Sequence, residues 1–426
     1  MGAVSDPARG ERLHELAAGA RAAGRLALDT EFMGEGRYRT LLCLVQLAIP
    51  EGQGPDERIM ILDPLEDDLD GSPLAEVLAD PMVRIVVHAG RQDVALLRRR
   101  FRAEVTNVFD TQVAAGFAGL GAQSSYDSLL SEILGLRVAK TASFTRWDTR
   151  PLSAEQVAYA REDVVHLLEL ADVLEGRLQE LERLQWALEE CEAVARSSDE
   201  RDPEAILRRL PRVAGLGARA TAVARELVGW RESVAERQNR PVQGVLSDAT
   251  LVELARRSPS SREALGRIRG LGGGVGGRRG AELLDVIRRG TERPQDSISV
   301  APRPPAPKPD DPPLVALAEA LVRARARKAG LAYELLATRA ELQAIVTAVR
   351  SGGEADVRTL SGWRREVAGG ALLDLLAGRS SLAVSGSGSE AHLRVEPVEP
   401  GAGAAEAGDP SFGPGHEPSR KDRPGT

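Results

Sequence analysis

Two acidic residues close together near the N-terminus could bind a metal ion. Asp29 and Glu31 belong to the run LDTEF (residues 28–32), at the end of a short apolar stretch. On a strand, residues i and i+2 project from the same face, roughly 6–7 Å apart, so both carboxylates would point to one spot. Their repulsion requires a cation, and hard oxygen ligands favour Mg²⁺ or Mn²⁺. The alternative is a chance pair of acids on a surface strand.

A third carboxylate follows another apolar stretch. In VVHAGRQD (residues 86–93) a strand is expected to end, a glycine turns the chain, and Asp93 falls in the first turn of the next helix. The helix dipole also stabilises a carboxylate there, by a few tenths to about 1 kcal/mol, which is the purely structural explanation. For His88 we favour a structural role, hydrogen-bonding the turn, over contact with a substrate.

A tyrosine and a fourth carboxylate lie four residues apart, at Tyr159 and Asp163. Ser153 and Gln156 form an S-x-x-Q capping box just after Pro151, which predicts that a helix begins there. Residues i and i+4 share a helix face, so the tyrosine hydroxyl would lie beside the carboxylate. The alternative is a packed tyrosine whose hydroxyl bonds to a nearby acid.

These side chains need elements that bring distant segments together. Short apolar runs bounded by turn residues or charges predict strands, and other stretches have helical spacing. The predicted strands are 26–29, 42–49, 59–62 and 84–87, and the predicted helices include 94–100 and 154–181. Such alternation indicates an α/β domain. Gln46, inside one apolar run, is expected to satisfy local backbone groups.

The composition excludes several classes of protein. The chain has 426 residues, a net charge of −7 and only 3% aromatic residues, so aliphatic side chains must fill its cores. No apolar run approaches the roughly 20 residues that span a bilayer, and no secretion signal is evident. Cys43 and Cys191 are far apart, which excludes a disulfide scaffold or a cysteine zinc site. None of the four lysines follows a glycine, so the sequence has no GxxxxGK(S/T) phosphate-binding loop. We therefore expect that the protein does not use ATP.

Charge and composition divide the chain. Residues 201–300 have helical spacing and a net charge of +7, although the whole chain is acidic. Arginines can neutralise phosphates, so a basic helical segment beside an acidic one suggests a polyanionic partner. The alternative is an ordinary solvated helical face. Residues 293–313 are rich in proline and predict a stiff linker. A second helical unit is expected over 314–383, and a disordered tail over 384–426.

The acidic residues and their surrounding motifs, in this order and spacing, resemble the DEDD superfamily of 3′–5′ exonucleases, in its tyrosine subclass. The similarity is greatest to the ribonuclease D family. It implies an RNase H-like mixed sheet flanked by helices over 1–195, an HRDC helical domain over 200–292 and a second HRDC-like domain over 314–383. The motifs are ALDTEF, LCLVQLA, VVHAGRQD, FDTQVAA and K-x6-W-x2-RPLS-x2-Q-x2-YA-x2-DV in the first domain, WRESVAERQNRPVQGVLSDATLVELA in the second, and LLATRAEL and LSGWRREVAG in the third.

The resemblance also implies roles for the acidic residues. Asp29 would bridge two divalent cations, Mg²⁺ or Mn²⁺, with Glu31 and Asp163 completing the first site and Asp93 holding the second. Tyr159 would orient the attacking water. A histidine subclass places its histidine five residues before the last aspartate, and that position is alanine here.

Four further residues are candidates for binding the substrate. Phe32 and Met33 follow the first acidic pair and could stack on the terminal base, since stacking tolerates any base. Core packing is the equal alternative for Phe32. Arg278 and Arg279 follow a glycine run and could approach phosphate, unless that run is simply a loose loop.

The expected function is therefore 3′–5′ exoribonuclease activity that releases nucleoside 5′-monophosphates from structured RNA, with tRNA precursors as the favoured substrate. A DNA exonuclease of the proofreading or Werner type, or a non-catalytic RNA-binding scaffold, is the alternative. We expect a cytoplasmic monomer with no membrane association.

Overall fold

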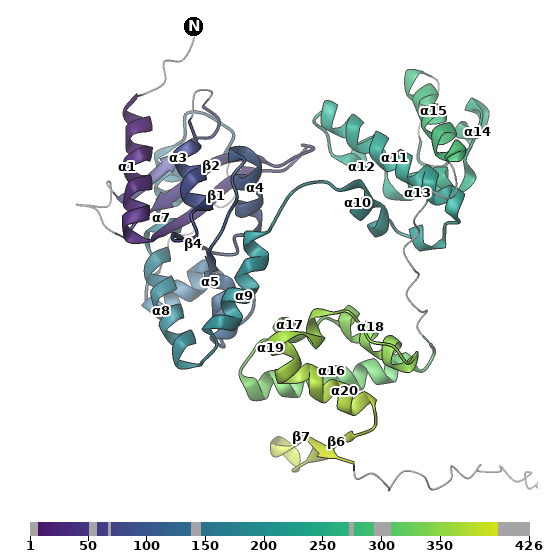
Figure 1. Cartoon of the computed structure of the whole chain (residues 1–426). Coiled ribbons are helices and arrows are strands. Elements are labelled where there is room, and N and C mark those ends of the chain that lie inside the picture. The colour runs from purple at the N-terminus through teal and green to yellow at the C-terminus, as the bar shows by residue number, and fades with distance from the viewer. Residues whose placement is uncertain are drawn as a thin grey trace, which may run out of the picture. The chain divides into compact units, whose positions relative to one another are not determined.

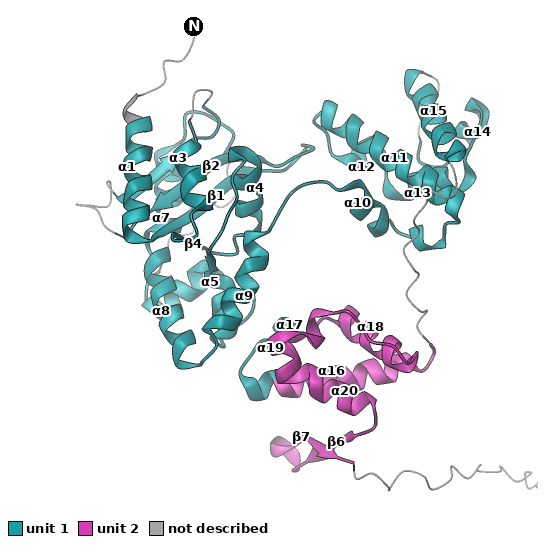
Figure 2. Ribbon diagram, viewed as in Figure 1, with its two compact units in different colours: residues 1–306, 326–335 teal, residues 307–325, 336–426 magenta. Residues whose placement is uncertain are grey.

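The structure is a computed structural model that describes residues 7–50, 58–66, 70–137, 146–271, 277–293 and 308–398. Lys140 and most of the glycine run before Arg278 lie outside these ranges. The chain divides into two compact units (Figure 2), residues 1–306 with 326–335, and residues 307–325 with 336–426. None of the helices in the described ranges has the length and hydropathy needed to cross a bilayer.

The first unit contains a five-stranded mixed sheet (Figure 1). Its order is β3-β2-β1-β4-β5; β2 runs antiparallel to β1 and β3, and β4 runs parallel to β1 and β5. β1 is thus the central strand, with neighbours on both sides. The strands are β1 (Arg25–Met33), β2 (Leu41–Ala48), β3 (Ile59–Leu62), β4 (Arg84–Val87) and β5 (Val108–Asp110). The four predicted strands are confirmed, and β5 is additional.

Helices cover both faces of this sheet. On one face, alternate apolar residues of β1 and β2 form a core with the apolar sides of α1 (Pro7–Ala23), α3 (Ser72–Ala79) and α4 (Arg91–Phe101). On the other face, α7 (Ala154–Val165) contacts β1, β2 and β3. This second face is the one that carries Asp29, because Leu28 and Thr30 alternate onto the first.

The predicted helix over 154–181 is two helices in the structure. α7 ends at Val165, and α8 (Leu167–Glu180) begins directly after His166. The His166 ring lies 3.4 Å from the Glu169 carboxylate. Apolar residues recur at helical spacing on both sides of this junction, so the sequence pattern does not reveal it. α9 (Leu184–Ala195) follows and packs on β5.

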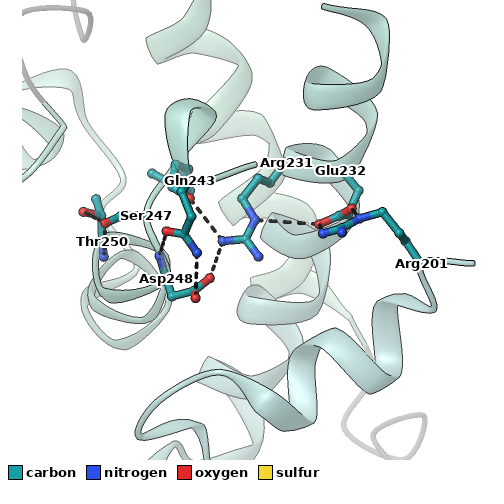
Figure 3. Close-up of polar contacts among 8 residues, drawn as sticks. Arg201, Arg231, Glu232, Gln243, Ser247, Asp248 and Thr250 are labelled. Carbon is teal, nitrogen blue, oxygen red and sulfur yellow. Dashed lines mark hydrogen bonds and ion pairs between the residues drawn. The ribbon is translucent and has the colours of Figure 1, made fainter. Parts of the chain in front are cut away.

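A helical domain follows in the same unit. It comprises α10 (Pro203–Arg209), α11 (Ala218–Arg237), α12 (Val242–Val245), α13 (Asp248–Arg257), α14 (Arg262–Gly266) and α15 (Arg278–Glu292) around an aliphatic core. Arg231 of α11 is buried and donates to the Leu246 carbonyl at 3.1 Å and to the Asp248 carboxylate at 2.5 Å (Figure 3). Gln243 also donates to Asp248, at 2.8 Å, so this network joins α11 to the start of α13.

The second unit contains a further set of helices, and α16 begins earlier than predicted. Asp311 is the first residue of α16 and is buried; its carboxylate accepts from the Lys308 backbone at 2.9 Å and from Arg350 at 2.6 Å. Pro312 and Pro313 therefore lie in the first helical turn, where proline is tolerated. The linker prediction was wrong for 311–313. The helices after residue 308 are α16 (Asp311–Ala329), α17 (Tyr333–Leu336), α18 (Arg339–Arg350), α19 (Gly362–Arg364) and α20 (Gly370–Leu376). Residues 326–335, which include the end of α16 and most of α17, belong to the first unit.

Part of the predicted disordered tail is an antiparallel strand pair. β6 (Ser380–Ser385) pairs with β7 (His392–Pro397), with Val384 opposite Leu393. The prediction of disorder was therefore wrong for 384–398, while 399–426 lie outside the described residues. In β7 the apolar residues Leu393 and Val395 alternate with polar ones, but β6 has three apolar residues in a row, so a period of two is hard to see in the sequence.

Candidate active site

Strand β1 carries two carboxylates to the site, and α7 brings a third. Oxygen atoms of Asp29, Glu31 and Asp163 all lie within 4.8 Å of one another. The alternation of a strand places the first two on one face, as the sequence predicted. The pairing of β1 with β2 shifts register between Glu31 and Phe32, and such an irregularity redirects the side chains beside it. The three acids meet because α7 packs across this face of the sheet.

Helix α7 is fixed at its start and along its length. The Ser153 hydroxyl accepts from the Gln156 backbone at 3.1 Å, and the Gln156 side chain accepts from the Ser153 backbone at 2.9 Å. The predicted capping box is thus confirmed. Tyr159 packs against Trp147, with ring centroids 6.1 Å apart, in an apolar cluster that also includes Met33. This packing sets the rotation of α7 that turns Asp163 towards β1.

Asp93 lies in the first turn of α4, as predicted, and is buried. The Asp93 carboxylate accepts a hydrogen bond from the Thr30 hydroxyl. Thr30, which lies between Asp29 and Glu31 on β1, thus also anchors Asp93. The turn before α4 is held by Asp110, whose carboxylate accepts from the Ala89 backbone at 3.0 Å and the Gly90 backbone at 2.9 Å.

Sequence reasoning missed two residues that shape this region. Asp110 ends β5 and also caps α5 (Thr111–Phe117), accepting from the Gln112 and Val113 backbones. The sequence does indicate the capping role of Asp110, since an acidic residue directly between an apolar run and a helix is a typical N-cap. Tyr126 begins the short helix α6 (Tyr126–Leu129). Burial and the charge of Asp163 raise the pKa of its hydroxyl, but no periodic pattern in the sequence marks its position.

The four carboxylates are hard to ionise together without a cation. Burial raises the pKa of each: Glu31 from 4.5 to about 8, with added repulsion from Asp163, and Asp93 from 3.8 to about 6. The pKa of Asp163 rises from 3.8 to about 7 through burial and the charge of Asp127. Burial and the charge of Asp93 hold the pKa of Asp29 well above its ordinary value.

This donor set fits hard divalent cations. Carboxylate oxygens are the ligands that Mg²⁺ and Mn²⁺ prefer, and a cation would compensate the repulsion that raises these pKa values. Asp29, Glu31 and Asp163 could share one ion, and Asp93 lies close enough to Asp29 for their charges to interact.

Comparison with known proteins assigns the chain to a family. A 3′-5′ exonuclease family model matches residues 7–179, and an HRDC domain model matches residues 220–287. Ribonuclease D of Granulibacter bethesdensis is 38% identical over 366 residues, covering 85% of this chain and 89% of that protein. This chain belongs to the ribonuclease D family.

Other members of the ribonuclease D family agree with this assignment. Ribonuclease D of Acidiphilium cryptum is 37% identical over 378 residues, covering 88% of this chain and 92% of the relative. The crystal structure of Escherichia coli RNase D, an exoribonuclease involved in structured RNA processing, matches with a TM-score of 0.75 and 28% identity, covering 86% of this chain and 96% of that one. The predicted fold, a mixed-sheet exonuclease domain followed by an HRDC domain, is therefore confirmed.

Three of the candidate substrate-binding residues lie on or beside the strands of the sheet: Phe32 and Met33 on β1, directly after Glu31, and His88 directly after β4. Phe32 is 39% exposed, so it is available to a ligand, whereas Met33 is partly buried in the cluster around Trp147. The His88 ring nitrogen Nδ1 lies 2.9 Å from the Thr111 hydroxyl, and its ring centroid lies 5.7 Å from that of Tyr126. These contacts give His88 a structural partner, and its contact with substrate stays a prediction.

The two candidate arginines lie in the helical domain, at the start of α15. Arg278 is exposed and pairs with Glu282 at 3.0 Å. Arg279 donates to the Val245 carbonyl and lies over the Trp230 ring, 6.0 Å from its centroid. Arg278 is thus open to phosphate, while Arg279 already ties α15 to the rest of the domain. Their role in substrate binding stays a prediction.

Proposed function

We propose that this 3′–5′ exoribonuclease works through two divalent cations, Mg²⁺ or Mn²⁺, held by Asp29, Glu31, Asp93 and Asp163. The observation that carries the proposal is the convergence of three carboxylates within 4.8 Å, in buried surroundings that resist their ionisation. Asp29, on the central strand, would contact both ions. Asp93, held by Thr30, would serve the second ion.

Such a pair of cations supplies an activated water and stabilises the leaving oxygen of a phosphodiester. The protein's own residues orient the reactants. Burial and the charge of Asp163 raise the pKa of Tyr159, so its hydroxyl stays protonated and can hydrogen-bond the attacking water. Phe32, beside Glu31 and partly exposed, would stack on the terminal base.

We infer that the substrate is the 3′ end of structured RNA, with tRNA precursors as the first candidate, and that the product is a nucleoside 5′-monophosphate. Support comes from the family, from the HRDC match and from the net charge of +7 over residues 201–300. The helical domain would guide the polymer by contacts with its phosphates, Arg278 among them.

We also propose the remaining features of the organisation. The exonuclease domain would occupy 1–195 and the HRDC domain 200–292, and α16 to α20 would form a second HRDC-like domain. The protein would act as a cytoplasmic monomer and without ATP.

The test is to incubate purified protein with a 3′-extended tRNA and either Mg²⁺ or Mn²⁺, then to size the products and identify the released nucleotides. We expect stepwise shortening from the 3′ end. A DNA oligonucleotide of the same sequence is the control, since it differs mainly in lacking the 2′-hydroxyl. Equal degradation of both polymers would refute the RNA preference, and failure to shorten the tRNA would refute the proposed substrate.

A further inference from the structure

The side chain of Gln46 is buried in the sheet without a hydrogen-bond partner. It lies near the middle of β2 and is 0% exposed. Neither its amide nitrogen Nε2 nor its oxygen Oε1 has a partner among the described residues. The sequence-based expectation that Gln46 satisfies local backbone groups was therefore wrong. A buried amide without partners destabilises a fold, so its presence needs a reason.

The strand register places Gln46 directly beside Asp29. Gln46 pairs with Asp29 of β1 on one side and with Ile61 of β3 on the other. Directly opposite residues on antiparallel strands project from the same face, with Cβ atoms about 4.5–5.5 Å apart. On β2 itself, the same-face neighbours are Leu44 and Ala48. Asp29 is thus the polar side chain that the sheet presents to this amide.

We propose that Gln46 is a positioning residue for the metal site, and that its amide N–H donates to the carboxylate of Asp29 in the metal-bound protein. An ionised carboxylate only accepts hydrogen bonds, at about four lone-pair positions, so it can bind a cation and an amide together. The inference rests on the metal site proposed above. It explains why a polar side chain occupies this position, although its other neighbours on the same face of the sheet, Ile61, Leu44 and Ala48, are apolar.

The physical consequence is a conflict between stability and metal binding. In the metal-free protein the amide is a buried polar group without compensation, and in the metal-bound protein it orients the residue proposed to contact both ions. Groups that orient metal ligands in this way typically change metal affinity or activity by 10–100-fold. Removing the amide should therefore stabilise the metal-free fold and weaken metal binding.

The test compares Gln46→Met with Ile61→Met, which alters packing on the other side of Gln46 without changing polarity. Methionine has nearly the length and volume of glutamine but no hydrogen-bonding amide. For Gln46→Met we expect the melting temperature in EDTA to rise by a few degrees. We expect its Mn²⁺ affinity, measured by titration calorimetry without RNA, to fall by about 10–100-fold. Ile61→Met should retain the wild-type Mn²⁺ affinity.

Three results would overturn the proposal. Unchanged Mn²⁺ affinity in Gln46→Met would mean that the amide does not act on the site. A less stable or unfolded Gln46→Met protein would mean that the amide has partners in the metal-free state, such as a buried water. An equal loss of affinity in Ile61→Met would make the effect one of packing. Because calorimetry needs no RNA, these outcomes are separate from a failure of the proposed substrate, which would appear only in the tRNA assay.

Discussion

Replacing Glu31 by glutamine should change how the stability of the metal-free protein depends on pH. Burial and the charge of Asp163 raise the pKa of Glu31 from 4.5 to about 8. A carboxyl group that binds its proton more tightly in the folded state stabilises the fold fully below its unfolded pKa. That stabilisation is lost as the pH rises towards the folded pKa, by about 1.4 kcal/mol per pH unit. Glutamine keeps the shape of the side chain but does not titrate.

The magnitude follows from this window. Between pH 6 and pH 8, Glu31 alone should lower the free energy of unfolding of the wild type by about 2 kcal/mol. The measurement is urea unfolding in EDTA at both pH values. We expect Glu31→Gln to lose about 2 kcal/mol less than the wild type over this interval. Glu180→Gln, at an exposed position on α8, is the control and should follow the wild type.

Equal losses of stability in wild type and Glu31→Gln would refute the reasoning, because they would show that Glu31 ionises as it does in water. In that case the carboxylates would not be a repelling cluster in need of a cation. Added Mn²⁺ provides a second check, since metal binding requires ionised carboxylates and should stabilise the wild type more at pH 8 than at pH 6.

Further substitutions test separate contacts. Tyr159→Phe removes the hydroxyl proposed to orient water but keeps the packing against Trp147. We expect kcat to fall about 100-fold with little change in melting temperature, and an unchanged kcat would remove that role. Thr30→Val deletes the hydrogen bond to Asp93, so we expect its Mn²⁺ affinity, measured by calorimetry, to be lower than that of the wild type. An unchanged Mn²⁺ affinity would show that Asp93 does not need this hydrogen bond. Arg231→Met should lower the unfolding free energy of the helical domain by about 1–2 kcal/mol, because it removes the hydrogen bonds to the Leu246 carbonyl and to the partly exposed Asp248 carboxylate. A stability equal to the wild type would contradict that account.

The parts of the site that depend on local periodicity could be predicted from the sequence. Asp29 and Glu31 share a face because strands alternate, and the Ser153 capping box marks where α7 begins. These features need only neighbouring residues. The identity of the partner segments, such as α7 lying across β1, came from the resemblance to a family and not from spacing.

The parts that depend on long-range register could not be predicted in this way. Nothing near Gln46 in the sequence indicates that Asp29 is its cross-strand partner, because register is set by the whole sheet. Asp110 holds the turn before Asp93 from a strand that the apolar pattern was too short to reveal. Pro312 and Pro313 were assigned to a linker, although Asp311 begins a helix there through contacts with a distant arginine.

The most direct test of the central claim is a crystal structure of the protein soaked with Mn²⁺, with the ions located by anomalous scattering. We predict two peaks about 3.5–4 Å apart. Asp29 should contact both, with Glu31 and Asp163 on one ion and Asp93 near the other. Peaks at other surfaces, with none among these four carboxylates, would contradict the account.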